Sequence, residues 1–398
     1  MAVAIAVVLL LVGIGAGYFT GYTLHKSSST SKIQLTESGS SLLYPLMTAW
    51  AGGYTASALS AASTGSGTGQ TDAEGGLVNI GGSDGYLTAA HSDGLINVPV
   101  AISAQLIAYN LPSVTHHLNL NGSILAQIYS GVITTWNDPL ILNAQSATVK
   151  TELNALSSET IYPIDRSDSS GDTFLFTSMC YVSWSGWTYG FGTSNLTGDA
   201  NVFEGGSGNV GVLTDLAGQA NSIGYVGISY NSTVTTDHLG YAALGDANSL
   251  NATGGIDASN YVLPSATNIS ADANLGLNQL EFTATNQLEI SLILGGSPGY
   301  PLLEHASLGA GGTAPTVADP HPYPIVNLEY ALIKTAPTGS TVTSAALAAT
   351  VAFLEWAISI GNWDTSDKAS TYIDGVNFIP LTPEVAGYDM QELAWVQP

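Results

Sequence analysis

The chain alternates between short apolar segments with the spacing of strands and longer segments with the spacing of helices. Residues 33–35 alternate as a strand does, and residues 42–50 follow with an apolar, helix-like run. Further strands are predicted at residues 78–84, 223–230 and 325–333, and further helices at residues 118–136 and 345–360. Turns rich in Gly, Ser and Asn separate these segments. The alternation of strands and helices predicts an α/β fold.

Other stretches have weaker patterns. Residues 95–110 contain two apolar segments, residues 205–211 form a Gly-rich loop, and residues 231–275 are polar and expected to be irregular. Residues 277–294 combine strand and helix patterns, and residues 295–324 form a long loop rich in Gly and Pro. The chain shows no internal repeat.

The N-terminus carries an apolar run. Residues 2–19 are almost wholly apolar, and with residues 20–24 the run reaches the length that spans a bilayer. We interpret residues 1–25 as a membrane anchor or signal segment, and residues 26–32 as a polar tether. No basic segment precedes the run and no clear cleavage site ends it, which favours an uncleaved anchor. The remainder is expected on the extracytoplasmic face of the cell membrane, anchored or secreted.

Cationic residues are scarce in this chain. Of its 398 residues, 6 are Lys or Arg and 30 are Asp or Glu, which gives a net charge of −24. The length indicates two domains. The charge argues against nucleic-acid binding, because phosphate backbones require cationic patches. A surface so poor in cations suits an acidic exterior, where carboxylates are largely protonated. Five N-x-Ser/Thr sequons permit glycosylation without arguing for it.

The sequence shows no pattern for a metal, a cofactor or a common catalytic motif. Cys180 is the only cysteine and is interpreted as a buried apolar residue. The seven His residues have no zinc-binding spacing. No nucleophile elbow and no phosphate loop with a lysine occurs. We therefore expect no metal and no cofactor, although a hydrolase built from a Ser and a distant His stays open.

One stretch indicates anion binding. Arg166 is the only arginine, and it lies among Asp165, Asp168 and Asp172. A guanidinium suits tetrahedral oxyanions, and Ser-Ser-Gly-Asp-Thr at residues 169–173 indicates a helix start that also favours an anion. The alternative is an ordinary surface arginine beside an ordinary helix cap, and these residues alone do not decide between the two.

Several short motifs in a fixed order resemble a known family. They include residues 39–45 (Gly-Ser-Ser-Leu-Leu-Tyr-Pro), 64–69 (Thr-Gly-Ser-Gly-Thr-Gly), 78–84 (Val-Asn-Ile-Gly-Gly-Ser-Asp), 101–105, 131–139, 166–176, 223–226 and 323–327. The chain resembles the phosphate-binding protein of the high-affinity phosphate ABC transporter from about residue 35 to about residue 383. The form of the arginine motif is similar to that of the archaeal and actinobacterial branch.

The resemblance implies a type II periplasmic-binding-protein fold, in which two α/β lobes enclose a ligand cleft. Lobe one would comprise residues 33–107 plus 325–398, and lobe two residues 108–324. The apolar N-terminal helix would precede lobe one.

The resemblance also implies a set of phosphate-binding residues. Donors would be the Ser41, Ser66 and Ser170 hydroxyls and the Leu42 and Gly171 N–H groups. Arg166 would supply positive charge, and Asp168 would hold the guanidinium group of Arg166 in place.

Asp84 would accept a proton from phosphate, which sulfate cannot offer near neutral pH. Asp172 departs from the family's usual Thr. It is either a second acceptor that pairs with H2PO4⁻ or a helix cap with Thr173 beside it.

The expected function is a non-enzymatic receptor that captures inorganic phosphate and delivers it to an ABC permease, held at the membrane by the N-terminal helix. The alternative is a structural or adhesive surface protein, such as a filament subunit, built on the same fold. A phosphatase-like hydrolase is the third reading.

Overall fold

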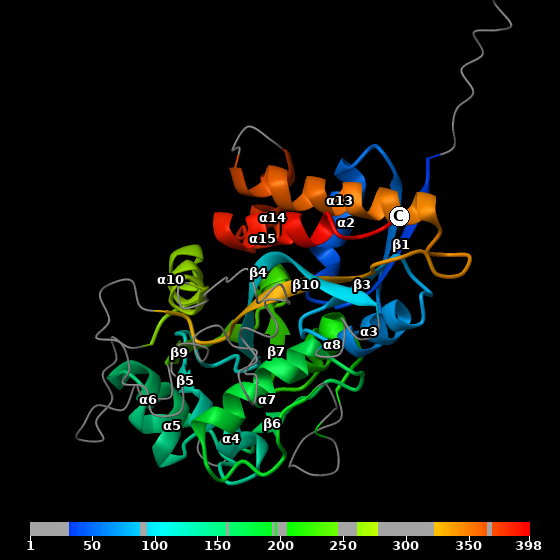
Figure 1. The fold of residues 1–398 in the computed structure, drawn as a ribbon. Coiled ribbons are helices and arrows are strands. Elements are labelled where there is room, and N and C mark those ends of the chain that lie inside the picture. The colour runs from blue at the N-terminus through cyan, green and yellow to red at the C-terminus, as the bar shows by residue number, and fades with distance from the viewer. Residues whose placement is uncertain are drawn as a thin grey trace, which may run out of the picture. The chain divides into compact units, whose positions relative to one another are not determined.

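The computed structural model describes residues 32–87, 94–156, 159–192, 196, 205–245, 261–277, 322–363 and 368–398 (Figure 1). The anchor predicted at residues 1–25 lies outside these residues, as do most of the tether and most of residues 277–324. Within the described ranges, no helix is both long and apolar enough to cross a membrane. Residues 34–398 form a single compact unit.

A mixed sheet organises this unit. Its strand order is β2-β1-β3-β10-β4-β7-β6, and β8 also pairs with β4. The strands are β1 (Gln34–Gly39), β2 (Ala58–Ser63), β3 (Ile80–Ser83), β4 (Leu95–Tyr109), β6 (Tyr162–Pro163), β7 (Ser222–Gly227), β8 (Gly240–Tyr241) and β10 (Val326–Lys334). Strand β1 runs parallel to β2 and β3, whereas β10 runs antiparallel to β3 and β4. Strands β5 (Asn119–Asn121) and β9 (Ala243–Gly245) form a separate parallel pair.

Strand β4 is the longest of the described strands, and it is buried along its whole length. Its residues 95–104 pair with β10, and from Gln105 onward it pairs with β7. The two apolar segments predicted at residues 95–110 are therefore one continuous strand. A strand covered on both faces carries apolar residues on both faces, which explains why the sequence shows no strict alternation.

Helices cover the sheet. They are α2 (Tyr44–Gly53), α3 (Ser66–Glu74), α4 (Gly122–Tyr129), α5 (Pro139–Asn143), α6 (Ala147–Ala155), α7 (Gly171–Ser183), α8 (Gly208–Gly218), α9 (Asn231–Thr236), α10 (Ala266–Leu277), α13 (Ser344–Trp363), α14 (Lys368–Gly375) and α15 (Pro383–Leu393). Figure 1 shows α2, α13, α14 and α15 together beside β1, whereas α4 to α7 lie at the opposite end of the unit. Helices α2 and α13 meet through the edge-on rings of Trp50 and Phe353, whose centroids are 6.3 Å apart.

Polar side chains mark where several helices begin. Asn121, Ser146, Ser170 and Thr382 each accept a hydrogen bond from the backbone N–H three residues later. These N-caps satisfy amide groups that have no partner inside the helix. The N-cap of α7 is Ser170 and not Asp172, so the capping role considered for Asp172 is wrong.

The α/β prediction is confirmed, and Cys180 is buried on α7 as interpreted. Two predictions of irregular structure are wrong. Residues 205–211 include the start of α8, and residues 231–275 include α9, β8, β9 and most of α10. These elements are short or polar, so that tertiary packing rather than their own periodicity decides them.

Candidate functional site

Arg166 is a fully buried cation held by a carboxylate fork. Its Nε donates to Asp168 Oδ1 at 2.7 Å, and its Nη2 donates to Asp168 Oδ2 at 2.6 Å. Such a two-bond pairing fixes the plane of the guanidinium. The N–H of Gly208, at the start of α8, also donates to Asp168 Oδ1. The side chain is therefore oriented before any ligand arrives.

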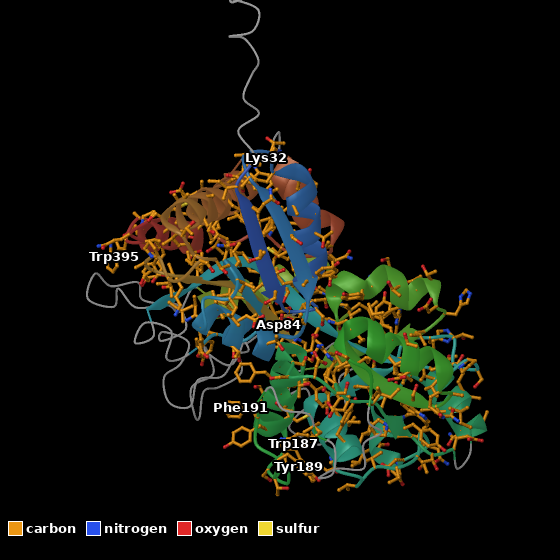
Figure 2. The ribbon with its side chains drawn as sticks, turned by 90° about the vertical axis from the view of Figure 1, so that its right-hand side faces the viewer. Lys32, Asp84, Trp187, Tyr189, Phe191 and Trp395 are labelled. Carbon is orange, nitrogen blue, oxygen red and sulfur yellow. The ribbon has the colours of Figure 1, made fainter. Side chains whose placement is uncertain are left out.

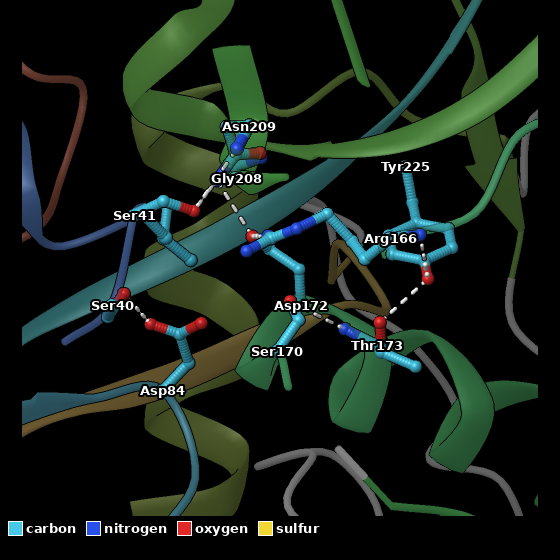
Figure 3. Close-up of polar contacts among 12 residues, drawn as sticks. Ser40, Ser41, Asp84, Arg166, Ser170, Asp172, Thr173, Gly208, Asn209 and Tyr225 are labelled. Carbon is cyan, nitrogen blue, oxygen red and sulfur yellow. Dashed lines mark hydrogen bonds and ion pairs between the residues drawn. The ribbon is translucent and has the colours of Figure 1, made fainter. Parts of the chain in front are cut away.

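Asp172 is a second carboxylate partner of Arg166 (Figure 3). Arg166 Nη1 lies 2.7 Å from Asp172 Oδ2, which also accepts from Asn209 Nδ2 at 2.7 Å. The Nε2 of Gln105 donates to the Asp172 carbonyl at 2.8 Å and to its Oδ1 at 3.2 Å. Asp172 is thus a fully buried acid that hydrogen bonds from neighbouring elements hold beside the only arginine.

Asp84 follows β3 directly and is buried. Ser40 Oγ donates to Asp84 Oδ1, and the Asp84 N–H donates to Ser66 Oγ at 3.2 Å. Asn327 Nδ2 on β10 donates to the Asp84 carbonyl. These contacts hold the Asp84 carboxyl in place with its Oδ2 directed toward Gly171. Figure 2 places Asp84 at the junction between the N-terminal strands and the helices that follow residue 120.

Backbone donors flank this acid on both sides. Ser41 and Leu42 lie in the turn before α2, and neither N–H has an acceptor within the described ranges. Gly171 is the first residue of α7, where N–H groups lack an acceptor inside the helix. Such unpaired donors at helix starts favour an anion.

The N-terminal segment and the middle segment touch directly here. A Cβ built on Gly171 would lie 2.4 Å from Asp84 Oδ2 and 2.6 Å from Ser66 Oγ. The Gly67 N–H donates to the Ser169 carbonyl at 3.1 Å, and Ser41 Oγ accepts from Asn209 Nδ2 at 2.9 Å. Only a glycine at position 171 allows this approach, since any larger residue would displace Asp84.

The cluster holds more carboxyl groups than cations. Burial raises the pKa of Asp172 to about 7; the nearby Asp84 charge adds to this, whereas Arg166, Gln105 and Asn209 oppose it. Burial also raises the pKa of Asp84, against hydrogen bonds from Glu329 and Ser40 and the charge of Arg166. Burial alone would raise the pKa of Asp168, but its bonds to Arg166 outweigh this and lower it.

Arg166 itself stays protonated. Burial acts to lower its pKa, but the hydrogen bonds that Arg166 donates to Asp168 and the charges of Asp172 and Asp168 raise it. Asp165 does not face the guanidinium: its Oδ1 accepts from the Arg166 N–H at 2.7 Å and from the Tyr225 hydroxyl. Asp165 therefore fixes the backbone of the arginine.

The structure brings together all the predicted site residues, namely Ser41, Leu42, Ser66, Asp84, Arg166, Asp168, Ser170, Gly171, Asp172 and Thr173. Thr173 lies at the edge, where its hydroxyl is 2.7 Å from the Tyr225 hydroxyl. Their roles toward a ligand stay predictions. No group of three His, Cys, Asp or Glu side chains suited to a metal ion occurs in the described part of the chain.

Sequence reasoning missed other members of the cluster, which are Ser40, Gln105, Asn209, Asn327 and Glu329. Ser40, Gln105 and Asn327 lie inside motifs that carried the family resemblance. Asn209 was hidden in the stretch interpreted as a loop, and Glu329 in an ordinary strand pattern. Polarity within buried segments was the available signal for these residues.

Comparisons with known proteins identify the family of this chain. A family model described as a PBP superfamily domain matches residues 25–359. The phosphate-binding protein PstS of Xylella fastidiosa is 30% identical over 256 residues, which are 62% of this chain and 64% of the relative. PstS of Pasteurella multocida is 32% identical over 257 residues, which are 62% of this chain and 67% of the relative. The chain thus spans just under two thirds of the first relative's length.

Solved structures share the fold. The phosphate-binding protein from Stenotrophomonas maltophilia aligns with a TM-score of 0.60 and 16% identity, over 90% of this chain and 94% of its own. At this identity the likeness concerns the fold alone. Taken together with the sequence relatives, the matched family model shows that the chain belongs to the PBP superfamily, as a relative of the phosphate-binding proteins PstS.

Proposed function

We propose that this protein is an extracytoplasmic receptor that captures inorganic phosphate and delivers it to an ABC permease. The observation that carries the proposal is one buried cluster in which Arg166 and Asp84 lie on opposing segments. Arg166 supplies charge to an oxyanion, and Asp84 supplies an acceptor for an O–H of that oxyanion. Phosphate has both features, and the names of the sequence relatives support it.

The donors for the remaining phosphate oxygens are the groups that flank the cluster. They are the hydroxyls of Ser41, Ser66 and Ser170 and the N–H groups of Leu42 and Gly171. Ser170 Oγ accepts from the Thr173 N–H, which leaves its own proton to donate. The helix start of α7 adds its dipole to these bonds.

Selectivity follows from Asp84. A sulfate oxygen has no proton near neutral pH, so it would face a buried carboxylate without a donor between them. Such a contact is costly, and it can supply a discrimination of ~10⁴–10⁵.

We propose the two lobes at residues 33–107 plus 325–398 and at residues 108–324. The partner change in β4 between Ala104 and Gln105 supports the first boundary, and the start of β10 at Val326 supports the second. The contacts of Gly67 with Ser169, and of Ser41 with Asn209, would then join the lobes in a closed state. Opening would separate Asp84 from Arg166 and release phosphate.

We propose that the receptor is not an enzyme and that residues 1–25 anchor it to the membrane, with the ligand site on the extracytoplasmic side. The family relationship supports a transport role. The scarcity of cationic residues supports an acidic exterior for the site.

Isothermal titration of residues 32–398 with phosphate and with sulfate tests this function. We expect saturable binding of one phosphate per chain and far weaker binding of sulfate. Absence of phosphate binding from pH 3 to 8 would contradict the receptor and favour a structural surface protein. Hydrolysis of a chromogenic phosphate ester, lost on Arg166→Met, would instead indicate an enzyme.

A further inference from the structure

Glu329 is a buried acid on β10 with no part in the proposed set of ligand contacts. Its exposure is 0%, and its Oε1 accepts from the Ser103 hydroxyl on the neighbouring strand β4. Its Oε2 is buried and meets no N–H or hydroxyl donor within the described ranges. A buried carboxylate oxygen without a donor is costly, so this oxygen requires a proton or a function.

The strand register brings Glu329 to Asp84. Tyr330 pairs with Ser83 across β10 and β3, and the same antiparallel register continued by one residue places Glu329 opposite Asp84. The pairing of β10 with β4 shifts register between Glu329 and Tyr330, as it does at a β-bulge. Bulges re-aim side chains, and they are frequent beside functional sites. Two residues away on the same strand, Asn327 donates to the Asp84 carbonyl.

The strand register and the effect of each carboxyl on the pKa of the other indicate that Glu329 and Asp84 share a hydrogen bond. Two carboxyls form such a bond only when one of them carries a proton. Glu329 is the better holder, because burial, the Asp84 charge and the bond to Asp84 all raise its pKa well above the usual range. The same bond lowers the pKa of Asp84.

Charged and titratable groups lie around Glu329 on several elements. The charge of Asp84, the residue after β3, raises the pKa of Glu329, and the charge of Asp172 on α7 raises it further. Strand β4 contributes the uncharged Ser103. Arg166 acts on the pair through Asp84, whose pKa it lowers. Helix α10, which also packs against β10, carries the buried Asp272.

We infer that Glu329 is a positioning residue for Asp84: its protonated carboxyl donates to the Asp84 carboxylate, holding it ionised and aimed as an acceptor for the O–H of the ligand. The inference rests on the proposed phosphate function. It adds that the acceptor is a proton-sharing pair of acids rather than a single acid. Loss of the Glu329 proton at alkaline pH would place two charges side by side and weaken phosphate binding.

Glu329→Gln tests this by keeping the geometry while removing the titration. The Gln amide can accept from Ser103 and donate to Asp84 at every pH. Phosphate affinity is measured by isothermal titration at pH 5, 7 and 9 in wild type and variant. From pH 7 to 9 we expect wild-type affinity to fall at least ~10-fold more than that of Glu329→Gln. The ionisation of phosphate itself is common to both, so parallel profiles would overturn the inference.

Two further variants separate positioning from folding. Glu329→Leu removes the donor to Asp84, and we expect phosphate binding roughly 10- to 100-fold weaker already at pH 5; unchanged binding there would contradict the role. Asp389→Asn alters another fully buried acid, on α15, which contributes nothing to the cluster. Its pH profile of affinity should match that of wild type.

A readout without ligand keeps the inference testable by itself. Infrared spectra of the unliganded protein at pH 7 should contain a protonated-carboxyl band that Glu329→Gln removes and Asp84→Asn shifts. Lack of such a band would overturn the shared proton even if phosphate binds. A wild type with this band but without phosphate affinity would refute the receptor function and leave the proton assignment standing.

Discussion

Arg166 Nη1 and Asp172 Oδ2 lie 2.7 Å apart, and both side chains are buried. The acid at position 172 is therefore a partner of the arginine. It also competes with an anion for the same guanidinium. Because the pKa of Asp172 is raised to about 7, this competition depends on pH.

Asp172→Asn should make phosphate binding less sensitive to pH. Above pH 7 the wild-type carboxylate is ionised and repels the ligand, so we expect the variant to bind phosphate ~10-fold more tightly at pH 8. At pH 5 the wild-type acid is neutral, and the two affinities should agree within ~3-fold. Asp168→Asn, which removes the two-bond pairing of the carboxylate with Arg166, should weaken phosphate binding at both pH values. A tenfold weaker affinity of Asp172→Asn at pH 3 would instead support the second-acceptor role of Asp172.

Gly171→Ala should block the approach of the two segments. The added Cβ would lie 2.5 Å from Asp84 Cβ, and neither side can yield in a buried site. We expect phosphate affinity to fall roughly 10- to 100-fold, as for overpacking of this size. Gly387→Ala on α15 is the matched control, since its Cβ meets nothing within 4 Å. It should leave affinity unchanged and raise the free energy of unfolding by up to ~1 kcal/mol. Equal affinities for the two variants would contradict the close approach.

Asn209 links three parts of the site. Its Nδ2 donates to Ser41 Oγ and Asp172 Oδ2, and its Oδ1 accepts from the Gly227 N–H at 2.7 Å. Asn209→Ala should weaken phosphate binding at least ~10-fold, because Ser41 and Asp172 lose a buried partner. Ser229→Ala removes a different contact between the same segments, the 2.9 Å bond to the Leu42 carbonyl. We expect it to change affinity less than ~3-fold. A similar loss in both would mean that Asn209 acts only by joining the segments.

Because Glu37 is a buried acid, we expect the free energy of unfolding to fall as pH rises. Both its oxygens are buried and have no hydrogen-bond partner among the described residues. Burial raises the pKa of Glu37 from 4.5 to about 8, and the nearby Ala62 N–H lowers it by a smaller amount. A raised pKa means that the folded state holds the proton more tightly. The contribution of Glu37 to the free energy of unfolding is complete below pH 4.5 and is lost as pH rises toward 8.

Glu37→Gln should flatten this dependence. Between pH 4 and pH 8 the variant should lose less free energy of unfolding than wild type, by up to about 5 kcal/mol. Glu74→Gln, at an exposed position on α3, should leave the wild-type dependence in place. Chemical denaturation at the two pH values measures the difference. Identical dependence in wild type and Glu37→Gln would contradict the account. Stability highest near neutral pH would also contradict an acidic exterior.

The sequence predicted the fold class and the long elements because their apolar periodicity is strong. The pairing of Arg166 with Asp168 was implied by the family resemblance of the motif around them. The sequence could not predict that Asp172 binds Arg166, since that contact depends on Asn209 and Gln105 from other elements. Short elements such as α9 and β9 were missed because tertiary packing decides them.

Glu329 shows a more general limit. In residues 325–330 the polar residues Asn327 and Glu329 alternate with apolar ones, a pattern that predicts one solvent-facing side. In the folded unit that side faces the buried Asp84, and both residues hold it. Periodicity identifies the polar face of a strand but not whether water or another acid lies opposite.

We propose that Asp84 distinguishes phosphate from sulfate by accepting a hydrogen bond from the phosphate O–H. The most direct test of this role is the ratio of phosphate to sulfate affinity, measured by titration calorimetry at pH 6 in wild type and in Asp84→Asn. In wild type we expect a ratio of at least ~10³, because sulfate leaves a buried acceptor without a donor. In Asp84→Asn the ratio should collapse by ~100-fold or more, through gained sulfate affinity as well as lost phosphate affinity. An unchanged ratio would contradict the account.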